Sequence, residues 1–362
     1  MILIALLLTA ACSDPVPQDT PANQSSTIQE TALPPSSAAP PPDTSKPGTI
    51  ETFRDWVVGC DNGLDCKATV LGPEAGDFPR LLMSVERKAG PLGALRIGFT
   101  GQEDATPPIA VTIDGKVVAS GGTTSPQGTY LTGADAQRVA AAMVEGKQAT
   151  VRSGATSQAL SLAGASAALR YIDDKQGRAG TQSALVARGP APATIPRAPA
   201  LPIVRVPAIG GTAAALTPEL LASMREQGSC ETYDDEYGRS ETAALSDTLT
   251  VVTLPCSRGA YNAMSAVFLV EDGTARPADF DVKTTMGPDD IGVGVITNGG
   301  FENGLLGSYA KGRGLGDCGV IQTFAWDGTG FRLVEMSEMP ECRGSTDYIP
   351  TFRAQVVRES AD

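Results

Sequence analysis

Alternation of apolar and polar residues predicts a folded region that starts near Thr49 and consists mainly of short β-strands. In the first half of the chain the strand-like runs are Phe53–Cys60, Leu81–Glu86, Leu95–Thr100, Ala110–Ile113 and Lys116–Ala119. In the second half they are Leu249–Leu254, Ala266–Val270, Ile291–Ile296, Val320–Trp326 and Phe331–Glu335. The Asp-Gly pairs at 114–115 and 327–328 predict two tight hairpin turns.

Two segments show the period of short amphipathic helices, and a third is indicated by the residues at its start and end. Between Thr132 and Gly146 four apolar residues share one face, and Thr132 and Asp135 have the spacing of a capping box. A second helix is predicted from Gly164 to Lys175. A third begins with Thr217 as its N-cap and Pro218 as its first residue, and it ends at Gly228.

The fold class expected from these elements is α+β and β-rich, with two disulfide-stapled domains of mainly antiparallel strands and a few short helices. We expect the first domain at 49–188 and the second at 208–358. The proline-rich segment between them, 189–207, is expected to be a linker, or a strand wrapped by loops. Residues 13–47 contain nine prolines and few large apolar side chains, which predicts a disordered tether.

The first residues combine a short apolar run, Met1–Leu8, with Thr9-Ala10-Ala11-Cys12. This pattern resembles a bacterial lipoprotein signal, whose cysteine is acylated and becomes the first residue after cleavage. We therefore expect a signal peptide at 1–11 and, over 12–48, a lipidated Cys12 followed by the tether. The lipid would anchor the protein at the membrane on the periplasmic side of the bacterial envelope, and the non-acidic Ser13 favours the outer membrane. An ordinary secretory signal is the alternative, and it would also export the chain.

Seven cysteines are an odd number for an exported protein, and assigning Cys12 to the lipid leaves six. Six cysteines in an oxidising compartment indicate three disulfides, for which 15 connectivities exist. Sequence spacing favours the local pairs Cys60–Cys66, Cys230–Cys256 and Cys318–Cys342.

Composition excludes several classes of function. The chain has 362 residues and a formal net charge of −13, so clustered phosphate contacts are not expected, and neither is a nucleic-acid partner. Histidine is absent, which excludes Ser-His and Cys-His nucleophile pairs and histidine metal ligands. The sequence marks no catalytic residue, no cofactor and no metal site.

Three groups of charged residues are weaker candidates for chemistry. A small anion-recognising patch is predicted at Lys311, Arg313, Arg343 and Arg353, and the alternative is that these residues form local salt bridges. Acidic runs at 234–236 and 289–290 offer oxygen ligands for calcium, although solvated acidic turns have the same composition. Asp317 and Asp327 are the carboxylates best placed to act as an acid, but each also suits a turn.

Several motifs indicate a family. Phe53, Asp55, Trp56, Cys60 and Cys66, with Ser161, Gly164 and Ala167–Leu169, resemble the periplasmic domains of the invasion-associated locus B type. A longer set resembles the bacterial family known as domain of unknown function 1176. It comprises Asp173–Thr181, Pro255-Cys256, Gly259–Asn262, Gly312–Gly319, Trp326–Gly328 and Cys342–Gly344. The resemblance implies export to the envelope and brings no established activity, cofactor or catalytic residue.

We therefore expect a lipid-anchored envelope protein that acts as a non-catalytic binding or structural module, with an envelope protein or a glycan as its partner. One alternative is a carboxylate-dependent hydrolase of cell-wall or extracellular polymers, since such an enzyme needs only two acidic residues. The other is a calcium-stabilised, adhesin-like module.

Overall fold

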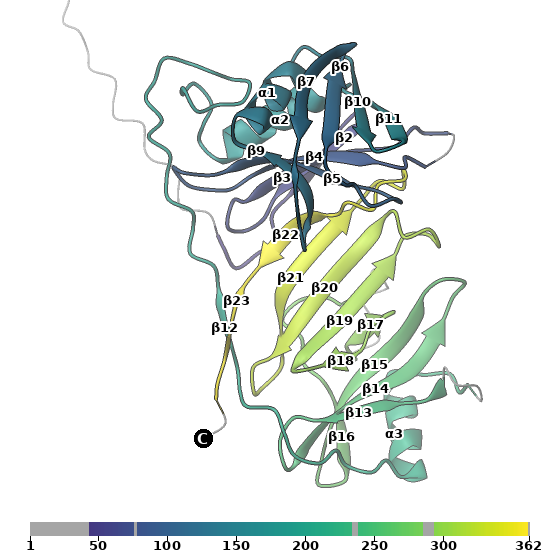
Figure 1. The fold of residues 1–362 in the computed structure, drawn as a ribbon. Helices are drawn as coiled ribbons and strands as arrows, with labels where there is room; N and C mark the ends of the chain where they lie inside the picture. Colours follow the sequence, from purple (N-terminus) through teal and green to yellow (C-terminus); the bar gives the residue numbers. More distant parts are fainter. Residues whose placement is uncertain (1–42, 76–77, 234–237, 285–292, 361–362) are drawn as a thin grey trace, which may run out of the picture. The chain divides into compact units, whose positions relative to one another are not determined.

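Antiparallel strands dominate the computed structural model, which describes residues 43–75, 78–233, 238–284 and 293–360 (Figure 1). Three helices and three disulfides accompany the strands in this part of the chain. The predicted β-rich α+β class is confirmed. Within the described ranges, no helix combines the length and the apolar character needed to cross a membrane.

Strands of the first half form two antiparallel sheets. The seven-stranded sheet has the order β1-β2-β3-β4-β5-β9-β8, with β1 (Ile50–Phe53), β2 (Trp56–Cys60), β3 (Cys66–Val70), β4 (Leu82–Arg87), β5 (Leu95–Thr100), β8 (Thr123–Ser125) and β9 (Gly128–Thr132). The four-stranded sheet has the order β11-β10-β6-β7, with β6 (Ile109–Ile113), β7 (Lys116–Gly121), β10 (Gln148–Ser153) and β11 (Thr156–Ser161). One apolar core joins residues of both sheets with the buried faces of two helices.

Those helices are α1 (Gly133–Met143) and α2 (Ala165–Lys175), and both bury the predicted faces. In α1 the buried residues are Ala136, Val139, Ala140 and Met143. The predicted capping box is wrong, because Thr132 makes no side-chain cap bond. Asp135 pairs with Arg138 instead. Its side chain is one methylene shorter than the glutamate that usually reaches back to the cap.

The run predicted as one strand, Phe53–Cys60, is a hairpin of β1 and β2 with its turn at Arg54-Asp55. Arg54 has φ of +56°, and tertiary contacts hold the turn. The Asp55 N–H donates to the Ala163 carbonyl, and the Asp55 carbonyl accepts from the Leu71 N–H. Because the partners lie 16 and 108 residues away, nothing in the local pattern indicates this reversal.

Strands of the second half form two further sheets. The first has the order β13-β14-β15-β16, with β17 also paired to β15; these are β13 (Glu241–Ala244), β14 (Leu249–Arg258), β15 (Ala263–Glu271), β16 (Thr274–Pro277) and β17 (Val295–Thr297). The second has the order β18-β19-β20-β21-β22, with β18 (Phe301–Glu302), β19 (Leu305–Lys311), β20 (Gly319–Trp326), β21 (Phe331–Met339) and β22 (Ile349–Arg353). Phe324, Trp326 and Phe331 lie in a shared core of these sheets.

The segment predicted as a linker contains a strand. Its last residues form β12 (Ile203–Val206), which pairs in parallel with β23 (Gln355–Arg358) at the other end of the described chain. Helix α3 (Pro218–Gly228) follows, and the Thr217 hydroxyl accepts from the Leu220 N–H as predicted.

All three predicted disulfides are confirmed: Cys60–Cys66, Cys230–Cys256 and Cys318–Cys342. Cys60 and Cys66 lie opposite each other on β2 and β3, closing the tight turn between these strands. Each of the other two bonds closes a loop that contains a β-hairpin, β13–β14 in one and β20–β21 in the other.

Candidate functional site

Three of the four residues in the predicted basic patch are paired with carboxylates. Arg343 donates to Asp55 at 2.7 Å, Arg353 to Asp61 and Asp65, and Arg313 to Asp317. Lys311 lies over the ring of Tyr309, 5.4 Å from its centroid. Carboxylates therefore already compensate the charges of the three guanidinium groups. This is the arrangement described above as the alternative, in which these residues form local salt bridges. Anion recognition by this patch stays a prediction.

Arg353 is part of a clamp between β22 and the Cys60–Cys66 loop. The Asn62 side chain donates to the Arg353 carbonyl at 2.8 Å and accepts from the Arg353 N–H at 2.8 Å. The amide thus satisfies both backbone groups of Arg353, as a neighbouring strand would. Asp61, whose side chain is only 1% exposed, accepts from the Arg353 guanidinium and from the N–H groups of Gly63 and Asp65. The loop is a structural joint whose polar groups are satisfied internally.

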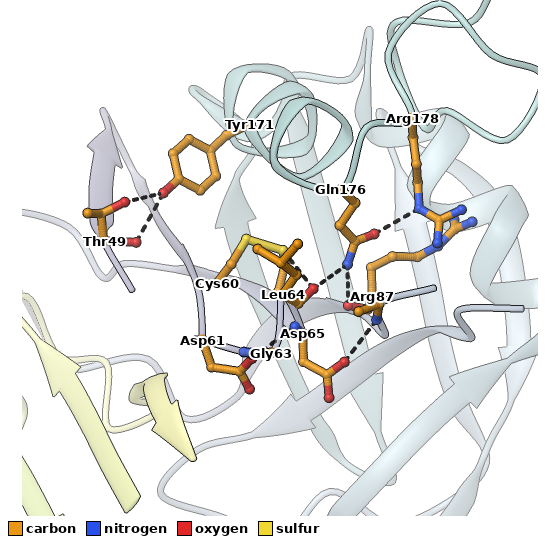
Figure 2. The surroundings of a disulfide bond; sticks show 12 residues. Thr49, Cys60, Asp61, Gly63, Leu64, Asp65, Arg87, Tyr171, Gln176 and Arg178 are labelled. Carbon is orange, nitrogen blue, oxygen red and sulfur yellow. Dashed lines mark hydrogen bonds between the residues drawn. A yellow bond between two sulfur atoms is a disulfide. The ribbon is translucent and has the colours of Figure 1, made fainter. Parts of the chain in front are cut away.

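The same loop is tied to the end of α2 (Figure 2). The Gln176 side-chain amide donates to the Leu64 carbonyl at 2.8 Å and to the Arg87 carbonyl at 2.9 Å, and its oxygen accepts from Arg178. Arg178 is fully buried and also donates to the Gly90 carbonyl at 2.7 Å. This part of the family motif therefore orders the polypeptide and does not face a reactant.

A second motif, Gly259–Asn262, lies against the glycine-rich turn Gly312–Gly319. The Tyr261 hydroxyl donates to the Gly312 carbonyl at 3.0 Å. Asn262 exchanges two hydrogen bonds with the backbone of Lys311, at 2.9 and 3.1 Å. Asn298 donates to the Asn262 side chain at 2.8 Å and to the carbonyls of Tyr261 and Tyr309. Two stretches about fifty residues apart are therefore joined into one surface.

The glycine-rich turn is also joined to the Cys342–Gly344 motif. Asp317 accepts from the Gly344 N–H at 2.6 Å and from Arg313 at 2.7 Å. The hydroxyls of Tyr309 and Tyr348 both donate to the Gly316 carbonyl. These bonds give the turn a defined shape, and the disulfide from Cys318 to Cys342 fixes its end.

Neither candidate acid has the pKa of a general acid. Burial acts to raise the pKa of Asp317, but the hydrogen bonds from Arg313 and Gly344 outweigh it and lower that pKa. Burial is likewise outweighed at Asp327, where Arg332, Gly330 and Thr329 lower the pKa to about 2. An acid catalyst needs a raised pKa, so both carboxylates instead act as acceptors in turns.

An open pocket of about 310 Å³ lies beside the joined motifs. Its lining combines aromatic rings, hydroxyls and side-chain amides, notably from Tyr233, Ser257, Arg258, Tyr261, Asn262 and Asn298. Tyr261 is 41% exposed, and its hydroxyl bond to Gly312 fixes the ring. Arg258 stacks on the Tyr233 ring, 4.3 Å from its centroid. The arrangement offers a rigid aromatic face beside several hydrogen-bonding groups.

The sequence pattern does not indicate the role of Asn262 and Asn298 in this surface. Asn298 has φ of +45°, and the run Asn298-Gly299-Gly300 indicates only a turn. The three hydrogen bonds that its side-chain amide donates go to residues at least eleven positions away, so no local pattern marks them.

Two predictions concern residues that the structure does not describe. Cys12 and all five acidic calcium candidates, Asp234, Asp235, Glu236, Asp289 and Asp290, lie outside the described ranges. Among the residues that are described, no three Cys, Asp or Glu side chains are grouped as a metal site requires.

Comparison with known proteins identifies the family. A family model described as "Protein of unknown function (DUF1176)" matches residues 50–354. The uncharacterized protein YpfG of Escherichia coli (strain K12) is 30% identical over 313 residues, 80% of this chain and 88% of that protein. The crystal structure of invasion associated protein b from Bartonella henselae has a TM-score of 0.29 and 20% identity, and it covers 36% of this chain and 99% of its own. Because the family model spans most of the chain and all the joined motifs, this protein belongs to the DUF1176 family, as its sequence predicted.

Proposed function

We propose that this protein is a non-catalytic binding module of the bacterial envelope and that its pocket at Tyr233, Tyr261 and Asn262 binds a glycan. The observation that carries the proposal is that Tyr261 and Asn262, two residues of a distinctive motif, line the pocket and are held by hydrogen bonds to the backbone of Gly312 and Lys311. Binding sites are concave and combine apolar surface with a few well-placed polar groups, which describes this lining.

The chemistry of the pocket suits a sugar ring. One face of a sugar ring is lined by C–H groups, which pack on an aromatic ring such as that of Tyr261, while its hydroxyls need donors and acceptors. Asn262 and Asn298 lie beside that ring and are held in place by backbone hydrogen bonds. Such a preorganised surface loses little entropy when it binds.

The N-terminal sequence supports a location in the cell envelope where glycans are present. The lipoprotein-like pattern ending at Cys12 would hold the protein at the periplasmic side of the outer membrane, and residues 13–47 would act as a spacer. Cell-wall glycans are within reach of such an anchor.

Co-sedimentation of the purified protein with isolated cell-wall sacculi and with insoluble polysaccharides tests the proposal. We expect wild-type protein to sediment with at least one polymer and Tyr261→Ala to remain in solution. Tyr261→Phe keeps the ring and loses only the hydroxyl bond to Gly312, so it should still bind. Tyr171→Ala, a tyrosine on α2 outside the pocket, is the matched control.

Two outcomes would contradict the proposal. Equal sedimentation of wild type and Tyr261→Ala would show that the pocket is not the binding surface. Release of soluble sugars during the incubation would indicate the alternative, a carboxylate-dependent hydrolase, because a binding module leaves the polymer intact.

A further inference from the structure

A second pocket, of about 610 Å³, lies beside strand β1 at the start of the described chain. Residues 48–51 contribute to its lining, together with residues of β20 and β21. Ile50 packs there against an apolar cluster that contains Met339. The lining includes two carboxylates, Glu51 and Glu338, and no lysine or arginine. The pocket therefore combines apolar surface with negative charge.

Strand β1 is an edge of the seven-stranded sheet and pairs only with β2 among the described strands. The two-residue turn Arg54-Asp55 joins Phe53 to Trp56, which makes these flanking residues a hydrogen-bonded pair of the hairpin. Backbone directions alternate along an antiparallel strand. The N–H and C=O groups of Thr52 and Ile50 therefore point away from β2, toward the open side of the sheet.

An observed bond supports this alternation. Gly48, two residues before Ile50, donates its N–H to the Thr351 carbonyl of β22 at 2.8 Å. At Ile50 and Thr52, no described segment supplies a backbone partner on that side. Thr52 is also exposed, so its outer backbone groups are accessible.

Unpaired backbone groups at a sheet edge, next to a pocket, are the arrangement by which many proteins bind an extended peptide. The peptide backbone adds one strand to the edge of the sheet. Alternate side chains of the added strand point to one face, where a pocket can accept them. The short β1 edge and its neighbouring pocket offer both parts of such a site.

The side chains of β1 indicate which peptide sequence fits. Ile50 and Thr52 lie on one face of the strand, and Glu51 lies on the opposite face and is exposed. Among the described residues, no lysine or arginine lies within ion-pair distance of Glu51. A basic residue opposite Glu51 on an added strand would compensate its charge, and apolar neighbours of that residue would face the side of Ile50.

We propose that the β1 edge binds an extended segment of a partner protein in which apolar and basic residues alternate. Two other occupants fit less well. Residues 13–42 of this chain contain no lysine or arginine, and their many prolines lack the N–H that strand pairing needs. A second copy pairing through β1 would bring two Glu51 carboxylates close together, which is unfavourable. The site shares no lining residue with the glycan pocket, so the two proposals are tested independently.

Fluorescence anisotropy of a labelled seven-residue peptide of alternating valine and lysine, titrated with the purified full-length protein, tests this proposal. We expect saturable binding at physiological ionic strength, and binding at least about tenfold weaker for the peptide with glutamate in place of lysine. N-methylation of alternate amides separates strand addition from charge attraction, because it removes N–H groups and keeps the charge. Methylation of one alternate set should abolish binding, and methylation of the other set should not.

Variants locate the site. Thr52→Pro removes one outward N–H at an edge position, where proline is tolerated, and should weaken binding at least about tenfold. Thr124→Pro is the matched control on β8, the opposite edge of the same sheet, and should bind as wild type does. Glu51→Lys changes an exposed side chain and should reverse the preference toward the glutamate peptide, by about threefold or more.

Three outcomes would overturn the proposal. The first is equal binding of the two methylated peptides, which would indicate charge attraction alone. The second is wild-type affinity in a folded Thr52→Pro, or an unchanged charge preference in Glu51→Lys. The third is a concentration-dependent dimer that Thr52→Pro abolishes, since the occupant would then be a second copy of this chain.

Discussion

Replacing Arg353 by methionine tests whether the clamp at the Cys60–Cys66 loop stabilises the protein. Arg353 donates to Asp61, whose side chain is 1% exposed, and to Asp65, which is 20% exposed. The substitution leaves the Asp61 carboxylate buried without its cation. Breaking a fully buried pair costs about 3–5 kcal/mol. Because Arg353 itself is 35% exposed, solvent screening reduces this, and we expect a loss of about 2–3 kcal/mol.

Urea denaturation followed by tryptophan fluorescence measures this loss, since both tryptophans, Trp56 and Trp326, are buried. Asp61→Asn keeps an oxygen for the N–H groups of Gly63 and Asp65 and removes the charge. In the double variant Asp61→Asn/Arg353→Met we therefore expect part of the lost stability to return, with a coupling energy of at least about 1 kcal/mol.

Arg138→Met is the matched control, because it breaks an exposed pair with Asp135 on the surface of α1. Such pairs contribute about 0.5 kcal/mol or less. A loss below about 1 kcal/mol in Arg353→Met, or single-variant losses that simply add in the double variant, would refute the argument that Asp61 depends on Arg353.

Three further predictions concern the lipid on Cys12, the Cys230–Cys256 disulfide and the turn that contains Asp327. Cys12→Ser should block incorporation of labelled palmitate in cells, and equal labelling of the variant and the wild type would contradict lipidation of this cysteine. Replacing Cys230 and Cys256 together by alanine should lower the free energy of unfolding by about 3 kcal/mol, because the bond closes a loop of 26 residues; an unchanged urea midpoint would contradict this. The pKa of Asp327 is lowered from 3.8 to about 2, so its stabilisation should be complete above about pH 5 and be lost as the pH falls toward 2. Asp327→Asn should therefore cost about 1 kcal/mol at pH 7 and nearly nothing at pH 2, and a loss that is independent of pH would show that the charge is unimportant.

The helices and several hairpins were predictable because their signals are local. In α1, Ala136, Val139, Ala140 and Met143 recur at helical spacing, and in α3 Thr217 and Pro218 mark the start. Asp327-Gly328 defines the turn between β20 and β21, since Gly328 has φ of +95°. The local disulfide order was predictable for a related reason, because short sequence separations favour loop closure.

The Arg54-Asp55 turn, the pairing of β12 with β23 and the surface around Tyr261 were not predictable in this way. Each depends on partners far away in the sequence: Asp55 on Ala163 and Arg343, Ile203 on Gln355, and Asn262 on Lys311 and Asn298. The local sequence around a residue is the same whichever distant residue it contacts. Local patterns therefore cannot distinguish the observed pairings from other possible ones.

By itself, the sequence determined the classes of element, the local disulfides, the family and the exclusion of histidine chemistry. Only the tertiary structure decided how the charged residues are used. Arg343 and Arg353, predicted together as a ligand patch, are paired with Asp55 and Asp61, while Arg87, which no motif marked, lacks a carboxylate partner among the described residues. The physical reason is that charge compensation depends on distances of a few ångströms between residues hundreds of positions apart, and only the folded chain sets those distances.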